Sequence, residues 1–79
     1  MAIYIAISKT AETNMIAEYS FETTPLNVGK LRLDKVTGSI IVLVPAPDDP
    51  NSHIMARAVR KLSQHWKKGE VPDKTCWAS

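Results

Sequence analysis

The stretch "GKLRLDKVTGSIIVLVPAPDDP", residues 29–50, decides the fold, because it holds a strand pair, the end of a sheet and the start of a helix. Its first part alternates leucine with charged residues, the period of a half-buried strand, and its second part is the apolar run "IIVLV". Asp34 can accept hydrogen bonds from amides of the intervening turn, and Gly38 can adopt the left-handed conformation that re-enters the ladder. The stretch predicts a hairpin of strands over 29–35 and 39–45.

Two more strands are expected before this hairpin. In residues 2–9 the isoleucines share one side of the chain, and residues 15–23 repeat the alternation with methionine, alanine, tyrosine and phenylalanine on one face. All the strand connections are short, whereas parallel pairing would require long crossovers. The sequence therefore predicts a four-stranded antiparallel β-meander.

A helix is expected after the last strand. The prolines of residues 45–51 end the strand, Asp49 is suited to the N-cap and Pro50 to the first helical position. Gly69 is a residue type that commonly follows the last helical residue. We therefore expect a helix over about 50–68.

The last residues, 69–79, have too little pattern for an element, although Val71 and Trp77 indicate a tail that packs back onto the domain. The content of 44% hydrophobic and 23% charged residues is ordinary for a globular protein, so the chain should fold. The predicted fold class is α+β, with a four-stranded antiparallel meander followed by one amphipathic helix packed on one face. Residues 1–79 form a single domain with an irregular C-terminal tail.

The predicted helix has two chemically different sides. At about 100° per residue, six apolar side chains fall within roughly 140°. They are Ile54, Met55, Ala58, Val59, Leu62 and Trp66. The opposite arc, roughly 120° wide, has no acidic residue and carries the candidate binding residues, which are Arg57, Arg60, Lys61, Lys67 and Lys68.

Two interpretations of the basic arc remain open. It can be the solvated side of the helix, and the two lysines of the last turn complement the helix dipole. Arg57, Arg60 and Lys61 lie in mid-helix, where like charges on adjacent turns destabilise by roughly 0.2 to 0.5 kcal/mol per pair. Either Glu70 and Asp73 of the tail neutralise this trio, or an anionic partner does.

Catalytic and metal chemistry is not expected. Cys76 and either histidine could form a nucleophile and base, but no local signature surrounds them, and they lack the spacing of zinc ligands. His65 lies beside the apolar stripe and is expected to be a partly buried boundary residue. The three glycines are isolated, so no phosphate loop is present. We predict a protein that is not an enzyme and has no metal or cofactor.

The N-terminus has neither the basic region nor the long apolar region of a signal peptide. Nothing approaches the roughly 18 apolar residues of a membrane span. The single cysteine excludes an intramolecular disulfide framework and is typical of a reducing compartment. We therefore expect a cytoplasmic protein that does not associate with membranes.

One helix can cover only one face of the sheet. Glu18 and Glu22 could face Lys30 and Arg32 across neighbouring strands of the other face, which becomes apolar towards the last strand. Either the tail with Trp77 covers this apolar area, or a homodimer forms through the face or through an edge strand. A chain this short buries only about 60 to 65% of its unfolded surface, so pairing would stabilise it.

Two functions are consistent with these features. The preferred one is a small interaction module, of the accessory, inhibitor or immunity type, that binds an acidic partner protein through the basic helix face or the sheet face. The alternative is a nucleic-acid-binding module in which the same residues, extended by Lys74, contact phosphates. The alternative lacks a base-reading motif, and a net charge of +2 provides only a modest field.

Overall fold

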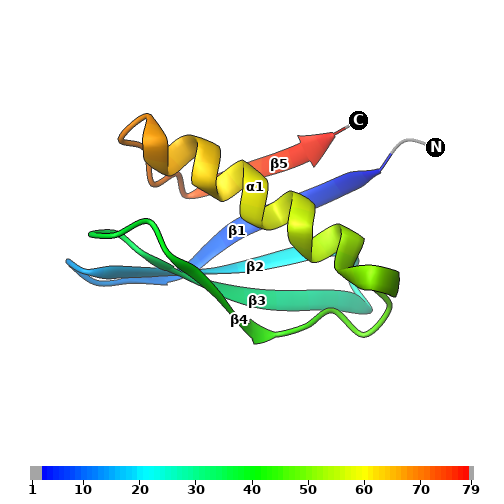
Figure 1. Ribbon diagram of the computed structural model, residues 1–79. Helices are drawn as coiled ribbons and strands as arrows, with labels where there is room; N and C mark the ends of the chain where they lie inside the picture. The colour runs from blue at the N-terminus through cyan, green and yellow to red at the C-terminus, as the bar shows by residue number, and fades with distance from the viewer. Residues whose placement is uncertain (1–2, 79) are drawn as a thin grey trace.

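The computed structural model describes residues 3–78. Five strands form one antiparallel sheet in the order β4-β3-β2-β1-β5, and helix α1 crosses one of its faces (Figure 1). The elements are β1 Tyr4–Glu12, β2 Ile16–Thr24, β3 Asn27–Asp34, β4 Ile40–Val44, a 3-10 turn Pro50–Ser52, α1 His53–Lys67 and β5 Lys74–Ala78. The predicted α+β class, with a four-stranded meander followed by one helix, is confirmed.

The bounds of β1 and α1 each differ from the prediction by three residues at one end, for local reasons, and the other bounds differ by one or two residues. β1 continues to Glu12 because an irregularity in its pairing with β2, after Lys9, lets the ladder resume. The predicted first residue of this strand, Ala2, lies outside the described residues. The helix begins at His53 rather than at residue 50, because positive φ angles of 57° and 56° at Asn51 and Ser52 interrupt the helical path.

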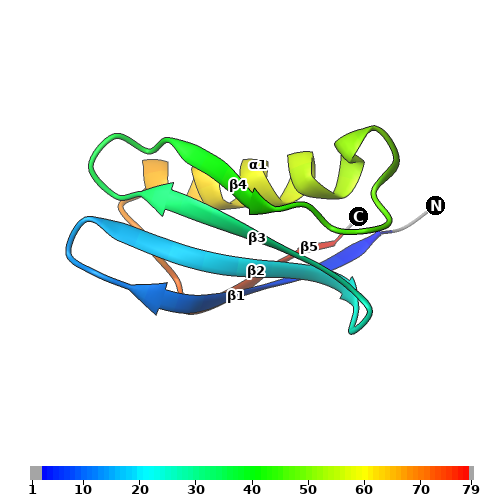
Figure 2. The same ribbon diagram turned by 90° about the horizontal axis from the view of Figure 1, so that it is seen from below.

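The irregular tail predicted over residues 69–79 is wrong for its last part. Lys74–Ala78 form β5, which pairs antiparallel with β1, and Trp77 stands opposite Ile5. Directly opposite residues share one face of a sheet, so Trp77 lies on the helix side and packs against the core. The tail therefore extends the sheet and leaves its other face open (Figure 2). Ser79 lies outside the described residues.

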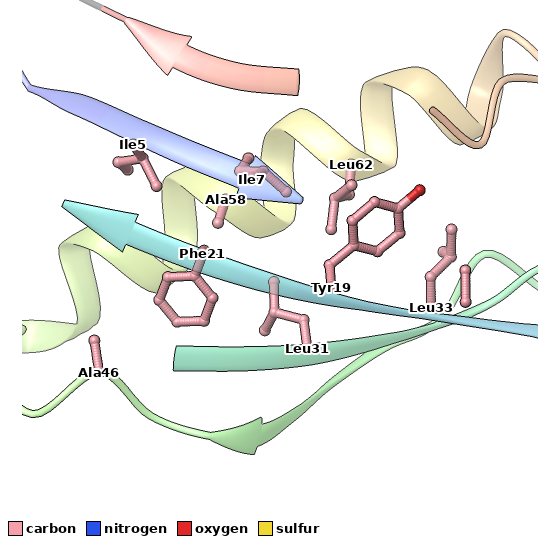
Figure 3. Packing of buried hydrophobic residues seen from close by; sticks show 10 residues of the cluster. Ile5, Ile7, Tyr19, Phe21, Leu31, Leu33, Ala46, Ala58 and Leu62 are labelled. Atoms are coloured by element: carbon pink, nitrogen blue, oxygen red, sulfur yellow. The ribbon is translucent and has the colours of Figure 1, made fainter. Parts of the chain in front are cut away.

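The core lies between α1 and the sheet. Alternate residues of β1, β2 and β3 meet two residues of α1 and one alanine that follows β4 (Figure 3). The buried residues are Ile5, Ile7, Ala17, Tyr19, Phe21, Leu31, Leu33, Ala46, Ala58 and Leu62. A Cβ at Gly29 would overlap the ring of Phe21, so glycine at this position allows the ring to lie against β3.

The turn between β3 and β4 packs against the helix. Asp34 Oδ1 accepts hydrogen bonds from the amides of Val36 and Thr37 at 2.8 and 3.1 Å, which lower the pKa of the carboxyl group. Gly38 has a φ of 81°, as the sequence predicted. The Trp66 indole covers Gly38, so α1 is held against this end of the sheet.

Candidate functional site

Helix α1 is fixed at its N-terminal end by one carboxylate. Asp49 Oδ1 and Oδ2 accept hydrogen bonds from the backbone amides of Ile54 and Met55 at 2.7 and 2.9 Å. Ser52, not Asp49, occupies the N-cap position of α1, but the Asp49 carboxylate satisfies the amides of the first helical turn from across the short 3-10 turn. Because the carboxylate satisfies two free amides of the first helical turn, it fixes where the helix begins.

The C-terminal end of α1 is closed by a glycine turn. Gly69 has a φ of 77°, its amide donates to the Trp66 carbonyl at 2.9 Å, and the Glu70 amide donates to the His65 carbonyl at 2.9 Å. This pair of bonds is the Schellman arrangement, which requires a left-handed residue after the helix. The turn brings Glu70 back over the last turn of the helix.

The five predicted binding residues lie on one side of this helix. Ala58 and Leu62 are buried against the sheet, which turns the basic arc outwards. Arg60, Lys67 and the C-cap residue Lys68 are exposed, and Arg57 and Lys61 are partly buried. The structure therefore brings together Arg57, Arg60, Lys61, Lys67 and Lys68.

The acids of the tail do not form ion pairs with the basic arc. Glu70 Oε1 lies 2.7 Å from His65 Nδ1, and Asp73 Oδ1 accepts a hydrogen bond from Lys9 Nζ at 3.0 Å. Lys68 acts on Glu70 only through longer-range attraction, which is a minor contribution to the lowered pKa of that carboxyl. Glu70 and Asp73 therefore do not neutralise Arg57, Arg60 and Lys61, which was one of the two alternatives for these charges.

Two of the other acids, Glu12 and Glu18, form ion pairs with cations of the sheet and of the turn that follows β3. Glu12 contacts Lys9 and Lys35 at 2.7 and 2.6 Å, and hydrogen bonds from Lys35 and then Lys9 lower the pKa of its carboxyl from 4.5 to about 2. Glu18 Oε2 accepts from Arg32 Nη2 at 3.1 Å. Three of the ten Lys and Arg residues, Lys9, Arg32 and Lys35, thus pair with carboxylates. Among the seven that form no ion pair within residues 3–78, five are those of the helix arc.

Of the acids and cations expected to face one another across β2 and β3, one pair is formed. Glu18 stands opposite Arg32 and bonds to it. Lys30, however, stands opposite Ser20, and Glu22 stands opposite Val28. The register offsets these two charges along the strands, so no ion pair between them is found in the described part of the chain.

His65 has two polar partners that the sequence did not reveal. Its Nδ1 lies 2.7 Å from Glu70 Oε1, and its Nε2 lies 2.9 Å from Thr75 Oγ1. The contact with His65 is the first cause of the lowered pKa of Glu70. Both ring nitrogens of His65 therefore have a polar partner. In the sequence, only Gly69 pointed to the contact between His65 and Glu70, because a glycine turn there brings the next residue back over the helix.

The Thr75 hydroxyl, the His65 imidazole and the Glu70 carboxylate lie in the order of a nucleophile, a general base and the acid that orients the base. Thr75 stands opposite Ile7 on the helix-covered face of the sheet. A pocket of about 280 Å³ lies on the open face instead, lined by Ile16, Arg32, Asp34, Ser39 and Ile41. Since the hydroxyl does not open into this pocket, the series is best described as a link between the end of α1 and β5.

Cys76 lies on the other side of β5 from this link. Successive side chains of a strand point to opposite faces of the sheet. Because Thr75 contacts His65 on the helix side, the side chain of Cys76 points to the other face. The thiol lies beside Tyr4, and a hydrogen bond between them raises the pKa of the phenol. The pairing of Cys76 with His65 considered from the sequence is therefore not formed.

Comparison of the chain with protein-family models, curated proteins and solved structures finds no match. Within residues 3–78 no helix is both long enough and apolar enough to cross a membrane. The fold and the site together define a small α+β protein with a basic side on its single helix.

Proposed function

We propose that the protein is a small, non-enzymatic interaction module, of the accessory, inhibitor or immunity type, that binds an acidic partner protein through the outward side of α1. One observation carries the proposal. Five cations occupy this side without an ion pair to any of the chain's eight acids, all of which lie in residues 3–78.

The arrangement of the five cations favours a binding surface over a purely solvated one. Arg57 lies three residues before Arg60 and four before Lys61, so like charges meet on adjacent turns and weaken the isolated helix. An acidic surface that docks on the arc would relieve this repulsion. It would also speed association, because opposite charges steer two proteins together.

The size of the arc fits a protein surface. From Arg57 to Lys68 the helix rises by roughly 16 Å, at about 1.5 Å per residue. The two arginines can each hold a carboxylate with two parallel hydrogen bonds, which gives such a contact geometric specificity. The acids on the sheet and the net charge of +2 weaken the general attraction to a phosphate backbone, which favours a protein partner over nucleic acid.

The test compares two double variants with the same change in charge. Arg57→Glu with Arg60→Glu alters the arc, whereas Lys30→Glu with Lys74→Glu alters two exposed lysines of the sheet. Each protein and the wild type are immobilised and exposed to a nuclease-treated native lysate. We expect an acidic protein to be retained by the wild type and by the sheet variant but not by the arc variant.

A second assay separates the two classes of partner. Binding of the purified proteins to a labelled DNA duplex of mixed sequence is measured at low and moderate salt. If duplex binding falls steeply with salt and is lost in the arc variant, the partner of the helix is nucleic acid and not an acidic protein. Equal retention of lysate proteins by all three forms, or retention by none, would contradict the proposed function.

A further inference from the structure

One edge of the sheet is apolar and open. β4 is an outermost strand, and in the described part of the chain no other strand pairs with its outer edge. Its five residues, Ile40–Val44, are all aliphatic, and Ile41, Val42 and Val44 are 52%, 39% and 47% exposed. An edge strand turns alternate N–H and C=O groups outwards, and an edge without charge is a template for another strand.

The opposite edge is built differently. β5 begins at the exposed Lys74, and a charged side chain on an edge strand discourages pairing with another chain. Cys76 and Trp77 are partly buried, and Trp77 packs against the core. Of the two edges, β4 is therefore the one suited to receive a strand.

The part of α1 that follows Trp66 round the helix, on the side nearest β4, is uncharged. Trp66 Nε1 donates to the Lys35 carbonyl in the β3–β4 turn, whereas His65 contacts Thr75 of β5. The Trp66 side of α1 therefore faces β4, and the His65 side faces β5. At about 100° per residue, the uncharged residues on the Trp66 side are Ala56, Val59 and Ser63. Three cations, Arg57, Lys61 and Lys68, lie on the His65 side. The other two, Arg60 and Lys67, lie beyond Ala56 on the Trp66 side, roughly 100° to 120° round the helix from Trp66, and are exposed to solvent.

These charges determine which strand the edge suits. β4 itself carries no cation that would attract the acidic partner assigned to α1. A second copy of β4 brings only aliphatic side chains opposite aliphatic ones and no like charges. In each copy Arg57, Lys61 and Lys68 lie towards its own β5, and the exposed Arg60 and Lys67 point away from the sheet, so that none of the five cations is directed at the junction.

We propose that β4 pairs antiparallel with β4 of a second copy, around a two-fold axis perpendicular to the sheet. The pairing of β4 with β3 shifts register after Val42, so Ile40–Val42 is the regular part of the strand. A two-fold axis at its centre sets Ile41 opposite the second copy's Ile41. The dimer is closed, since each copy uses the same surface, and both helices lie on the same side of one continuous sheet.

Sedimentation equilibrium over a wide range of protein concentration tests this arrangement. The wild type should have twice the chain mass of 8.8 kDa. Ile41→Glu should halve this mass, because two carboxylates would meet on the axis. Within one chain Ile41 stands opposite Arg32, so the new carboxylate has a cation beside it and folding should be retained. Leu26→Glu is the matched control, because Leu26 is 91% exposed outside β4, and it should stay dimeric.

A charge-swap mixture tests both the second copy and the register. Ile41→Lys alone should also be monomeric, and mixing it with Ile41→Glu should restore the dimer mass. A monomeric wild type at every concentration would overturn the proposal. So would a folded, dimeric Ile41→Glu variant, or two monomeric Ile41 variants that do not combine. Circular dichroism establishes whether each Ile41 variant is folded. If one of them is not folded, the mass of the wild type alone tests the proposed dimer.

Discussion

The two sides of α1 differ in what their side chains contact. On the inner side Ala58 and Leu62 are buried, Trp66 bonds to the β3–β4 turn, and His65 joins Glu70 and Thr75. Three other cations, Lys9, Arg32 and Lys35, are likewise bound to carboxylates at 2.6 to 3.1 Å. On the outer side five cations have no carboxylate partner within residues 3–78.

This difference assigns the stability of the fold to the inner side of α1 and the binding of a partner to its outer side. Contacts of the inner side account for the position of α1 and require nothing outside the chain. The outer side has charges that the chain's own acids do not balance, although the sheet shows that the chain can pair its cations. Changes on the inner side should therefore alter the free energy of unfolding, and changes on the outer side should alter association.

The largest effect is expected from Leu62→Ala. Leu62 is 1% exposed, and removing a buried leucine side chain lowers the free energy of unfolding by about 2 to 5 kcal/mol. Urea denaturation measures the change. Gln64→Ala, at an exposed position of the same helix, is the control and should leave stability nearly unchanged. A loss of less than about 1 kcal/mol would mean that the inner side does not hold α1.

A smaller effect, which is present above pH 4.5 and is lost in acid, is expected from Glu12→Gln. The pKa of Glu12 is lowered from 4.5 to about 2 by Lys35 and Lys9. A carboxyl whose pKa is lowered by folding stabilises the protein above its unfolded value and loses this contribution as pH falls through its folded value. The wild type should therefore be more stable above pH 4.5, and the two curves should converge towards pH 2.

Urea denaturation at a series of pH values measures this convergence. Lys35→Met, which removes one of the two cations, should weaken the pH dependence in the same direction. A constant difference between the wild type and Glu12→Gln across the whole window would show that the sheet cations are as unpaired as those of α1.

The smallest effect on stability is expected from Arg57→Glu with Arg60→Glu. A carboxylate at position 57 lies four residues before Lys61, a favourable spacing, so the free energy of unfolding should change by no more than about 0.5 kcal/mol. Lys30→Glu with Lys74→Glu is again the matched control in urea denaturation. A loss as large as that of Leu62→Ala would assign the outer side to the fold and remove the contrast between the two sides.

The strands and helix could be predicted where periodicity is long. Alternation identified four strands, and the turn chemistry of Asp34 and Gly38 placed the hairpin. β5 was missed because five residues are too short for a clear period and their partner, β1, lies at the other end of the chain. The 3-10 turn was missed because Asn51 and Ser52 adopt positive φ angles that neither residue type requires.

The basic arc could also be predicted, since helical spacing alone places its members on one side. The contacts around it could not. Glu70 pairs with His65 because a glycine turn brings it back, and Asp73 pairs with Lys9 because β5 lies beside β1. Both outcomes depend on tertiary structure that the sequence of the tail did not indicate.

The most direct test of the binding surface is a titration followed by NMR. Amide proton–nitrogen spectra are recorded as poly-L-glutamate is added at low salt to the wild type and to the Arg57→Glu, Arg60→Glu variant. We expect the largest shifts along the outer side of α1, with small shifts at Lys30 and Lys74, and we expect the helix shifts to disappear in the variant. Equal shifts at all exposed lysines and arginines, or none on α1, would contradict the claim that this side is a binding surface.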